Sequence, residues 1–446
     1  MTDISIAERQ SALHEHIERV LAKAAALGAT QAEAGASAGT GLSVTVRHRD
    51  VETLEYHRDQ GLDVTVYFGH RKGSASTSDL RPASLDETVS KACSLARFGA
   101  EDAAAGLAPA DRMATEFPDL QLYHHWPLEA EAAIELATTC ESAALEYDQR
   151  ISNSEGATVS TYEGCRVYGN SHGFLAGYPE SQHSISCAVL GSDGKEMQRD
   201  YEYTVARDAG QLAAAAAVGR QAAEHTIARL GARKLSTRVT PVIFPAKLAR
   251  GLFGHALAAL RGGALYRRAS FLLDGLDKAL FAPHLTLREC PFLPGALGSA
   301  AFDSEGVATA ERNLVEAGVL RGYVLGSYYA RKLGMESTGN AGGVHNLVVS
   351  DTGVSFADLV EQMDTGFVVT ELMGQGVNAV TGDYSRGAAG FWVERGEIAF
   401  PVHEVTLGGN LLEMYQGMAA VASDIDIRGG IRTGSVLIDR MTLAGN

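Results

Sequence analysis

The segment Leu62-Asp-Val-Thr-Val-Tyr-Phe68 alternates apolar and polar residues with a period of two. Such alternation is typical of a strand that buries one face. Leu42-Ser-Val-Thr-Val46, residues 51–56 and residues 74–78 are also rich in β-branched or alternating residues, and turn signals separate them. We therefore expect this part of the chain to form an antiparallel meander.

Helices are predicted on both sides of this meander. Residues 11–27 place an apolar stripe on one helical face, and Gly28 follows where a left-handed cap is needed. Ser84 and Glu87 have the spacing of a capping box, and the helix after them ends near Gly99. The first unit is thus predicted to have the order α-β-β-β-α.

The remaining chain divides into a linker and two further units. Residues 100–127 contain three prolines and little periodicity, which indicates a linker. Helical patterns at 128–147 and 211–230 enclose short strands, and glycine-punctuated strands follow Arg238. We expect an α+β fold whose C-terminal domain is large, β-rich and barrel-like with antiparallel strands. The predicted units are an N-terminal α/β unit with its linker at 1–125, a mixed middle unit at 126–235 and the β-rich domain at 236–446.

Composition excludes several classes of protein. The 446 residues are 46% hydrophobic and 21% charged, which is an ordinary globular balance. A formal net charge of −16 disfavours nucleic acid and anionic membranes as partners. The five cysteines show no CxxC spacing, and neither a secretory signal nor a membrane-spanning run is present. We expect a cytoplasmic protein with reduced thiols and with no nucleic-acid or membrane partner.

Charge is distributed unevenly along the chain. Residues 101–163 contain 13 acidic and two basic residues, a net charge of −11. Residues 229–268 contain nine basic residues and no acidic one. The two stretches are either solvated faces, or the basic stretch docks an acidic partner surface or a peptide carboxylate.

Known catalytic motifs are not matched in their required context. Residues 169–173 fit G-x-S-x-G, but the residues that follow cannot start the helix of a nucleophile elbow, so a turn between strands is expected. His14-Glu-His16 and His403-Glu404 lack the second histidine of HExxH, and no phosphate-binding glycine loop is present. We therefore assign no catalytic residue.

Dense polar-glycine segments mark the last third of the chain. They are TGNAGGVHN at 338–346, TGDYSRGAAGFW at 381–392 and Gly408-Gly-Asn410. Glycine at this density suits close backbone approach or positive φ, and the polar residues can satisfy exposed backbone groups. The segments are either tight barrel-corner turns or a rim that contacts a peptide or a partner.

These segments, together with residues 242–245, 251–255 and 268–272, resemble the TldD/PmbA family and specifically its TldE (PmbA) branch. The resemblance covers nearly the whole chain. It implies a pair of related chains, in which TldD is a zinc metallopeptidase with an HExxxH helix and a later cysteine ligand, and TldE is its metal-free relative. In this chain Arg250 and Gly251 stand where the first ligand and the general base would be, and only His255 matches. The resemblance therefore implies no metal or cofactor in this chain, with zinc in the TldD partner.

The function implied by the resemblance is that of a non-catalytic subunit. It would complete a TldD/TldE metallopeptidase complex that degrades or matures unfolded peptides, such as modified-peptide precursors and antitoxins. Its partners would be a TldD-like subunit and extended peptides. Two alternatives stay open: a stand-alone homodimeric peptide-binding protein, and a hydrolase with a non-metal site built from His345, Asp383, Tyr384 and Arg386. The candidate contact residues are Arg250, His255, Arg268, Asn340, His345, Asn346, Asp383, Tyr384, Arg386 and Asn410.

Overall fold

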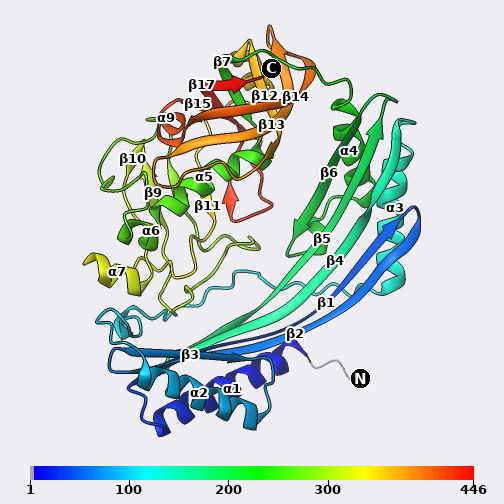
Figure 1. Ribbon diagram of the computed structural model, residues 1–446. Coiled ribbons are helices and arrows are strands. Elements are labelled where there is room, and N and C mark those ends of the chain that lie inside the picture. Colours follow the sequence, from blue (N-terminus) through cyan, green and yellow to red (C-terminus); the bar gives the residue numbers. More distant parts are fainter. Residues whose placement is uncertain (1–4, 446) are drawn as a thin grey trace.

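A long, curved antiparallel sheet forms the N-terminal half of the chain (Figure 1). The computed structural model describes residues 5–445. The six strands of the sheet follow the order β3-β2-β1-β4-β5-β6, and every neighbouring pair is antiparallel. The strands are β1 Gln31–Arg47, β2 Asp50–Phe68, β3 Arg71–Thr77, β4 Ile151–Asn170, β5 Leu175–Ser192 and β6 Met197–Ala206.

The central pairing of this sheet joins segments that are far apart in the sequence. β1 pairs with β4 from Glu33 opposite Asn170 to Val46 opposite Ala157. The predicted meander is therefore only half of a sheet, and residues 51–56 and 62–68 belong to the single strand β2. The strands expected in the first and second units lie side by side in one layer.

Four helices cover one face of the sheet, because the side chains of β1 alternate and their buried set lies on that face. The even-numbered residues toward both ends of β1 are buried: those at 32–36 lie in the cluster formed with α1 and α2, and those at 42–46 in the cluster formed with α3 and α4. Because side chains alternate across a strand, the odd-numbered residues point to the opposite, concave face. The helices are α1 Ile6–Ala26, α2 Pro82–Phe98, α3 Ala130–Leu145 and α4 Ala215–Ala228.

The ends of the first two helices test the local predictions. Gly28 follows α1 with φ 85°, which confirms the left-handed position after the helix. The capping box at Ser84 is wrong, because α2 already begins at Pro82 and its N-cap residue makes no side-chain bond. Proline fits the first helical turn since its φ is fixed and its missing N–H would have no helical partner. The hydroxyl of Ser84 donates instead to Asp79 at 2.6 Å.

A closed five-stranded barrel forms the core of the C-terminal domain, which confirms the barrel-like prediction. The sheet β14-β13-β12-β7-β17 closes through pairing of β14 with β17. The β7–β12 pair is parallel, whereas the other pairs in the ring are antiparallel. The barrel strands are β7 Arg238–Phe244, β12 Gly366–Met373, β13 Asp383–Glu394, β14 Glu397–Asn410 and β17 Val436–Ala444, and β15 Met418–Val421 extends the sheet from β17.

Helix α5 Ala246–Leu260 follows β7 directly and shares its core. Leu252 and Phe253 of α5 are buried in one cluster with Phe244 and Tyr415. A second sheet of short strands, in the order β10-β9-β8-β11-β16, completes the domain. Its strands are β8 Leu287–Glu289, β9 Arg312–Glu316, β10 Val319–Leu320, β11 Leu347–Val349 and β16 Ile431–Arg432. The remaining helices are α6 Gly262–Tyr266, α7 Ser327–Leu333, α8 Phe356–Met363 and α9 Leu411–Gln416.

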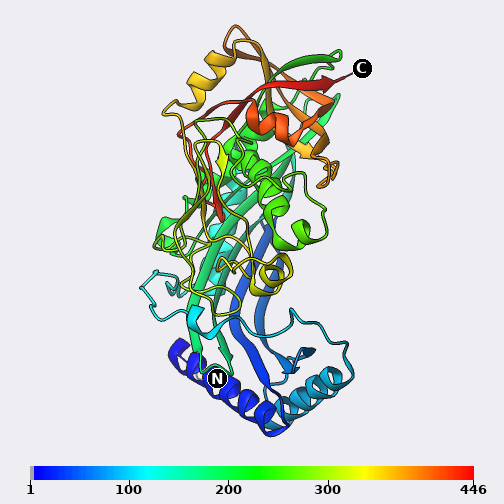
Figure 2. The same ribbon diagram turned by 90° about the vertical axis from the view of Figure 1, so that its left-hand side faces the viewer.

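Charged side chains join the C-terminal domain to the sheet. The guanidinium of Arg428 pairs with Glu202 of β6 and donates to the carbonyl of Tyr203 at 2.9 Å. Arg229 pairs with Asp200 of β6 at 3.1 Å and with Glu371 of β12. Figures 1 and 2 show the barrel at one end of the molecule and α1 and α2 at the other. The two halves therefore face each other along the concave side of the sheet.

Candidate functional site

A large cleft lies between the concave face of the sheet and two loops of the C-terminal domain. Its volume is about 1190 Å³. Odd-numbered residues of β1, including Glu33 and Ser37, form one wall, and residues 297–305 and 341–345 form the other. A pocket for a drug-sized ligand has roughly 300–1,000 Å³. The cleft is therefore large enough for a ligand longer than a small molecule.

Carboxylates outnumber guanidinium groups on the walls of the cleft. Asp303 is buried, and burial raises the pKa of its carboxyl to about 6, although backbone N–H groups of Glu305, Val307 and Ala341 stabilise the charged form. Burial also raises the pKa of Glu33, whose oxygens accept hydrogen bonds from two tyrosines. The five acidic lining residues are Glu33, Asp63, Glu180, Asp303 and Glu305, and the basic ones are Arg166 and Arg207.

Arg207 connects the two walls. Its Nη1 donates to Glu180 at 3.1 Å and its Nη2 donates to the carbonyl of Leu297 at 3.0 Å. Glu180 belongs to β5 and Leu297 to the loop of the C-terminal domain. A guanidinium group with several donors in a fixed plane suits this role. It holds the loop at a defined distance from the sheet.

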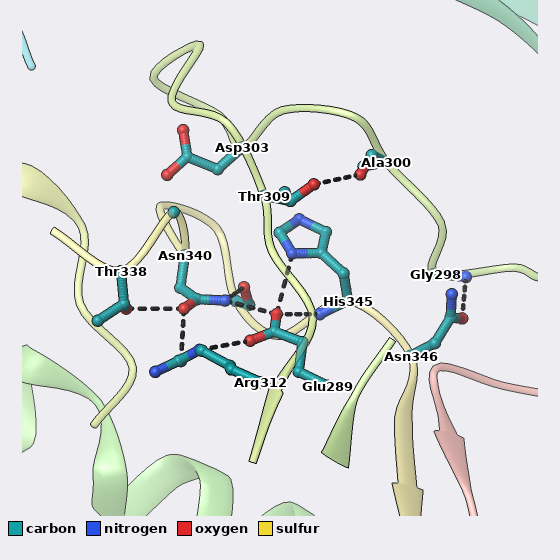
Figure 3. A network of polar contacts seen from close by, with 12 residues as sticks. Glu289, Gly298, Ala300, Asp303, Thr309, Arg312, Thr338, Asn340, His345 and Asn346 are labelled. Carbon is teal, nitrogen blue, oxygen red and sulfur yellow. Dashed lines mark hydrogen bonds and ion pairs between the residues drawn. The ribbon is translucent and has the colours of Figure 1, made fainter. Parts of the chain in front are cut away.

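A buried polar network supports the second wall (Figure 3). Glu289 of β8 is only 1% exposed, and its Oε1 accepts hydrogen bonds from Asn340 Nδ2 at 2.7 Å and from the His345 backbone at 2.8 Å. Its Oε2 accepts from Arg312 Nε at 2.9 Å. Burial alone would raise the pKa of Glu289, but the hydrogen bonds from His345 and the charge of Arg312 outweigh it and lower the pKa. Glu289 is thus a charged anchor for the segment 338–346.

The two asparagines of this segment fix its path. Asn340 Oδ1 accepts from Arg312 at 2.6 Å, and its Nδ2 also donates to the carbonyl of Gly343 at 3.0 Å. Asn346 has φ 47°, and its amide group contacts Ser299 at 2.7 Å and Gly298 at 3.0 Å. Asparagine tolerates positive φ better than most residues. Both side chains are buried, so the structure places them in the core of the loop.

His345 is the member of this network that reaches the cleft. Its Nδ1 lies 3.1 Å from Glu289 Oε1, and its side chain is 14% exposed. Because a carboxylate only accepts hydrogen bonds, Nδ1 is the donor to Glu289. Glu289 therefore fixes the orientation of a ring that lines the cleft and can contact a polar group of a ligand.

A second group of predicted residues lies between α5 and β13. The rings of His255 and Tyr384 are 6.3 Å apart and nearly perpendicular. Arg386 follows two residues after Tyr384 on the same face of β13, and its Nη2 donates to the carbonyl of Leu372 at 3.3 Å. Burial and the nearby Arg386 charge lower the pKa of His255. These three side chains form one cluster.

The other predicted residues lie in different surroundings. Asp383 is exposed at the start of β13, where it accepts hydrogen bonds from Thr381 at 2.6 Å and from Asn410 at 3.3 Å. Arg250 is half-buried near the 424–430 loop, and its charge contributes to the lowered pKa of Asp426. Arg268 is exposed with φ 54°.

The four residues of the alternative hydrolase site are not brought together. His345 contacts Glu289, whereas Tyr384 and Arg386 lie beside His255. Asp383 and Tyr384 are neighbours on one strand and therefore point to opposite faces. That arrangement gives no nucleophile with an adjacent base.

The basic stretch 229–268 makes many of its contacts within the chain. Lys234 pairs with Glu404 at 2.7 Å. Arg233 lies over the Phe400 ring. Others stack on Trp392 or Tyr201. These contacts belong to several elements, so the charges of this stretch are used partly for internal packing.

Sequence reasoning missed the acidic residues that shape the site. Glu33 stands in an alanine- and glycine-rich segment, and Glu289 stands in a strand of only three residues. The one signal for Glu33 was its odd position between buried alanines, which places it on the uncovered face. No signal in the sequence marks Glu289 or Asp303.

The side chains around His255 on α5 are not a suitable set of metal ligands. Over residues 5–445, no group of three or more His, Cys, Asp or Glu side chains is arranged to hold one. His255 has Tyr384 and Arg386 as polar neighbours, and a guanidinium repels a cation. Catalytic zinc takes about three protein ligands from imidazole, thiolate or carboxylate groups. The residues at this position do not fit zinc.

Fold and sequence together define the class of protein. Three consecutive domain models match the chain: PmbA/TldA metallopeptidase domain 1 at residues 32–96, the central domain at 123–230 and the C-terminal domain at 237–445. The chain belongs to the PmbA/TldD family. It is 46% identical to Metalloprotease PmbA of Escherichia coli O157:H7 over 445 residues, covering 100% of this chain and 99% of the relative. A PmbA homologue of Haemophilus influenzae is also 46% identical and covers 99% of both chains. These relatives place the chain in the PmbA (TldE) branch.

Solved structures show the same fold. A crystal structure described as a modulator of DNA gyrase, from Bacteroides thetaiotaomicron, has a TM-score of 0.93 at 26% identity and covers 100% of both chains. TldE from Thermococcus kodakarensis has a TM-score of 0.83 at 20% identity and covers 96% of this chain and 100% of its own. The α+β architecture with a C-terminal barrel is therefore that of the PmbA/TldD family.

None of the helices within residues 5–445 combines the length and the apolar character that crossing a bilayer requires.

Proposed function

We propose that this chain is the TldE-like subunit of a TldD/TldE metallopeptidase complex and is not catalytic by itself. The observation that carries the proposal is the environment of α5. By the family resemblance, Arg250 and Gly251 of α5 stand at the positions of the first ligand and the general base of HExxxH. In the described structure Tyr384 and Arg386 lie beside His255. A hydrolytic water needs a metal or a base to polarise it. The zinc would accordingly be held by the TldD-like subunit.

The substrates we propose are extended, unfolded peptides, such as modified-peptide precursors and antitoxins. The large cleft beside the concave sheet supports this, since it is lined by polar side chains and by loops with a fixed path. A narrow entrance between two rigid walls would admit a flexible chain and exclude a folded one. The acidic lining favours peptides that carry positive charge.

The proposed setting is the cytoplasm. All five cysteines are free and buried, which suits a reducing compartment. The net charge of −16 supports peptides and a TldD-like chain as partners instead of nucleic acid. No membrane partner is proposed.

A reconstitution experiment tests this function. A flexible fluorogenic peptide and a stably folded protein of similar composition are offered to this chain, to a TldD-like chain and to their mixture. We expect rapid cleavage of the flexible peptide by the mixture alone, and zinc in the TldD-like chain alone when the metal content of each separated subunit is measured.

Three results would count against the proposal. They are hydrolysis by the isolated chain, stoichiometric zinc bound to it, and a mixture no faster than the TldD-like chain. Size-exclusion chromatography of the same samples separates a further case. A homodimer that does not associate with the TldD-like chain would favour the alternative of a stand-alone peptide-binding protein.

A further inference from the structure

The cluster of His255, Tyr384 and Arg386 lacks an anion. Tyr384 is 2% exposed, and its hydroxyl lies beside the Arg386 guanidinium but makes no hydrogen bond of ordinary geometry with any described residue. The Nε of Arg386 is buried and also without a partner in the described structure. A buried polar group without a partner costs roughly 1–3 kcal/mol, and more when it is charged. Such a cost is expected where the missing partner is a ligand.

The charge of Arg386 points to the kind of ligand. Across residues 5–445 no carboxylate pairs with this guanidinium. It donates to the carbonyl of Leu372 at 3.3 Å and lies beside the Tyr384 hydroxyl. Arg432 is also half-buried without an acidic partner in the described structure, whereas Arg229 pairs with Asp200 and Arg312 with Glu289. What distinguishes Arg386 is the buried Tyr384 hydroxyl beside it, since two donors at one place suit an anionic group. A carboxylate matches the planar donor geometry of the guanidinium.

The surface of α5 next to the cluster is open. Gly251 and Gly254 share one helical face with His255, because residues three and four apart lie side by side. A Cβ added at Gly251 would meet no atom within 4 Å, and one at Gly254 would meet only Ile431 at 3.9 Å. Each glycine inside a helix costs about 1 kcal/mol relative to alanine. The two glycines leave a strip without side chains along which a peptide backbone can approach closely.

We propose that His255, Tyr384 and Arg386 form a binding site for the C-terminal carboxylate of an extended peptide. Arg386 and the Tyr384 hydroxyl donate hydrogen bonds to the carboxylate, and His255 contacts the last residue of the peptide. The peptide backbone lies along the glycine strip of α5. The choice of a peptide as the ligand rests on the proposed function, whereas the need for an anion rests on the geometry alone.

Binding of two matched peptides to the isolated full-length chain tests the site. The probes are a flexible nine-residue peptide with a free C-terminus and the same peptide as a C-terminal amide, each measured by isothermal titration calorimetry. A third probe is the amide with one internal aspartate, which separates a side-chain carboxylate from a terminal one. Charge-assisted hydrogen bonds contribute about 1.5–3 kcal/mol, so the free acid should bind roughly 10- to 100-fold more tightly than either amide.

Variants assign the effect to the cluster. Arg386→Gln and Tyr384→Phe should each abolish the preference for the free acid and leave affinity for the amide unchanged. The control is Arg440→Gln, which alters an exposed arginine of β17 and should keep the preference. Tyr384→Phe removes a hydroxyl that makes no hydrogen bond of ordinary geometry, so it should not lower the thermal midpoint of the ligand-free chain. Arg386→Gln also loses the bond to the Leu372 carbonyl, so its thermal midpoint is measured to show that the variant is folded.

Several outcomes would overturn the inference. Equal affinities for acid and amide would do so, as would an unchanged preference in Arg386→Gln, tighter binding of the aspartate-containing amide, or no binding of any probe. The reconstitution experiment remains separate from these results. Peptide cleavage by the mixed subunits combined with equal affinities would refute only the carboxylate site.

Discussion

Replacement of Glu289 by glutamine tests whether the buried network holds the wall of the cleft. The side chain of Glu289 is almost fully buried and accepts hydrogen bonds from Asn340, from His345 and from Arg312. Glutamine keeps one acceptor oxygen, but its N–H₂ group would face either the Arg312 guanidinium or the N–H donors of Asn340 and His345. Removing one partner of a buried ion pair costs about 3–5 kcal/mol. Since the Arg312 side chain is 20% exposed, we expect the lower end, about 3 kcal/mol.

The chain offers a matched control one residue away on the same two segments. Arg288 and Glu311 form a neighbouring ion pair, but their side chains are 54% and 43% exposed. Exposed pairs contribute about 0–1 kcal/mol, so Glu311→Gln should change stability little. The two glutamine variants differ in burial and not in chemistry.

Urea denaturation measured through one tryptophan gives the comparison. The chain has two tryptophans, and Trp392 lies in the barrel of the C-terminal domain. In a Trp126→Phe background its fluorescence reports the C-terminal half. At an m-value of about 2–3 kcal/mol/M, Glu289→Gln should lower the urea midpoint by roughly 1 M. An equal shift in Glu289→Gln and Glu311→Gln would refute the role of the network.

The effect of Glu289→Gln on the free energy of unfolding should depend on pH. The pKa of Glu289 lies below its ordinary value of 4.5, so its stabilising contribution is complete above that pH. It is lost as the pH falls through the lower pKa of the folded protein. The difference in unfolding free energy between wild type and Glu289→Gln should therefore be constant above about pH 5 and shrink in more acidic solution. A difference that grows toward low pH would contradict the assigned charge.

Three further predictions concern other parts of the molecule. Arg428→Gln removes the bond to Glu202 that joins the two halves, so hydrogen exchange should increase in β6 and in the 424–430 loop while the barrel strands stay protected. Gly219→Ala would place a Cβ 1.9 Å from a backbone carbonyl of α3, so it should destabilise the chain by more than about 2 kcal/mol in urea unfolding. Gly251→Ala would place a Cβ within 4 Å of no atom, so it should stabilise the chain by up to about 1 kcal/mol in the same measurement. In the folded chain the pKa of Asp303 is raised to about 6, so the folded chain binds this proton more tightly than the unfolded chain does. As the pH rises from 4 to 7, the unfolding free energy of wild type should therefore fall relative to that of Asp303→Asn.

Local signals in the sequence were sufficient for several elements. Period-two alternation identified the second half of β1 and of β2, since these residues bury one face. The apolar stripe and Gly28 identified α1 and its end. The glycine-punctuated strands after Arg238 indicated the barrel. Each of these features depends on a residue and its near neighbours.

The first half of β1 shows why other elements were not predicted. Residues 31–41 are mainly alanine and glycine, which have low strand propensity. They form a strand because β2 and β4 pair with both edges and because small side chains allow α1 and α2 to pack closely. Pairing with β4 depends on residues more than 100 positions away. No local pattern contains that information.

The sequence indicated one segment of the candidate site, but not the acidic residues opposite it or the arrangement of the two. The segment 338–346 was singled out for its density of polar and glycine residues, and it does form part of the cleft wall. The sequence left open whether its asparagines face a ligand or the core, and the structure places Asn340 and Asn346 in the core. Their partner Glu289 lies some fifty residues earlier in the chain. A hydrogen-bonding role that depends on such a distant residue cannot be derived from spacing.

A buried ionic network is not the most stabilising way to form the wall of the cleft, which indicates that the network has a further role. Apolar side chains of similar volume would often be equally or more stabilising than a buried ion pair. They could not, however, hold a glycine-rich segment in one path, because glycine has no side chain to pack and its backbone groups need partners. Glu289 accepts the backbone N–H of His345 and fixes its ring at the cleft, and it also holds Asn340, whose amide donates to the carbonyl of Gly343. The network is therefore better explained by the need for a defined binding surface than by stability, and loss of Glu289 should weaken peptide binding even at a temperature where the chain remains folded.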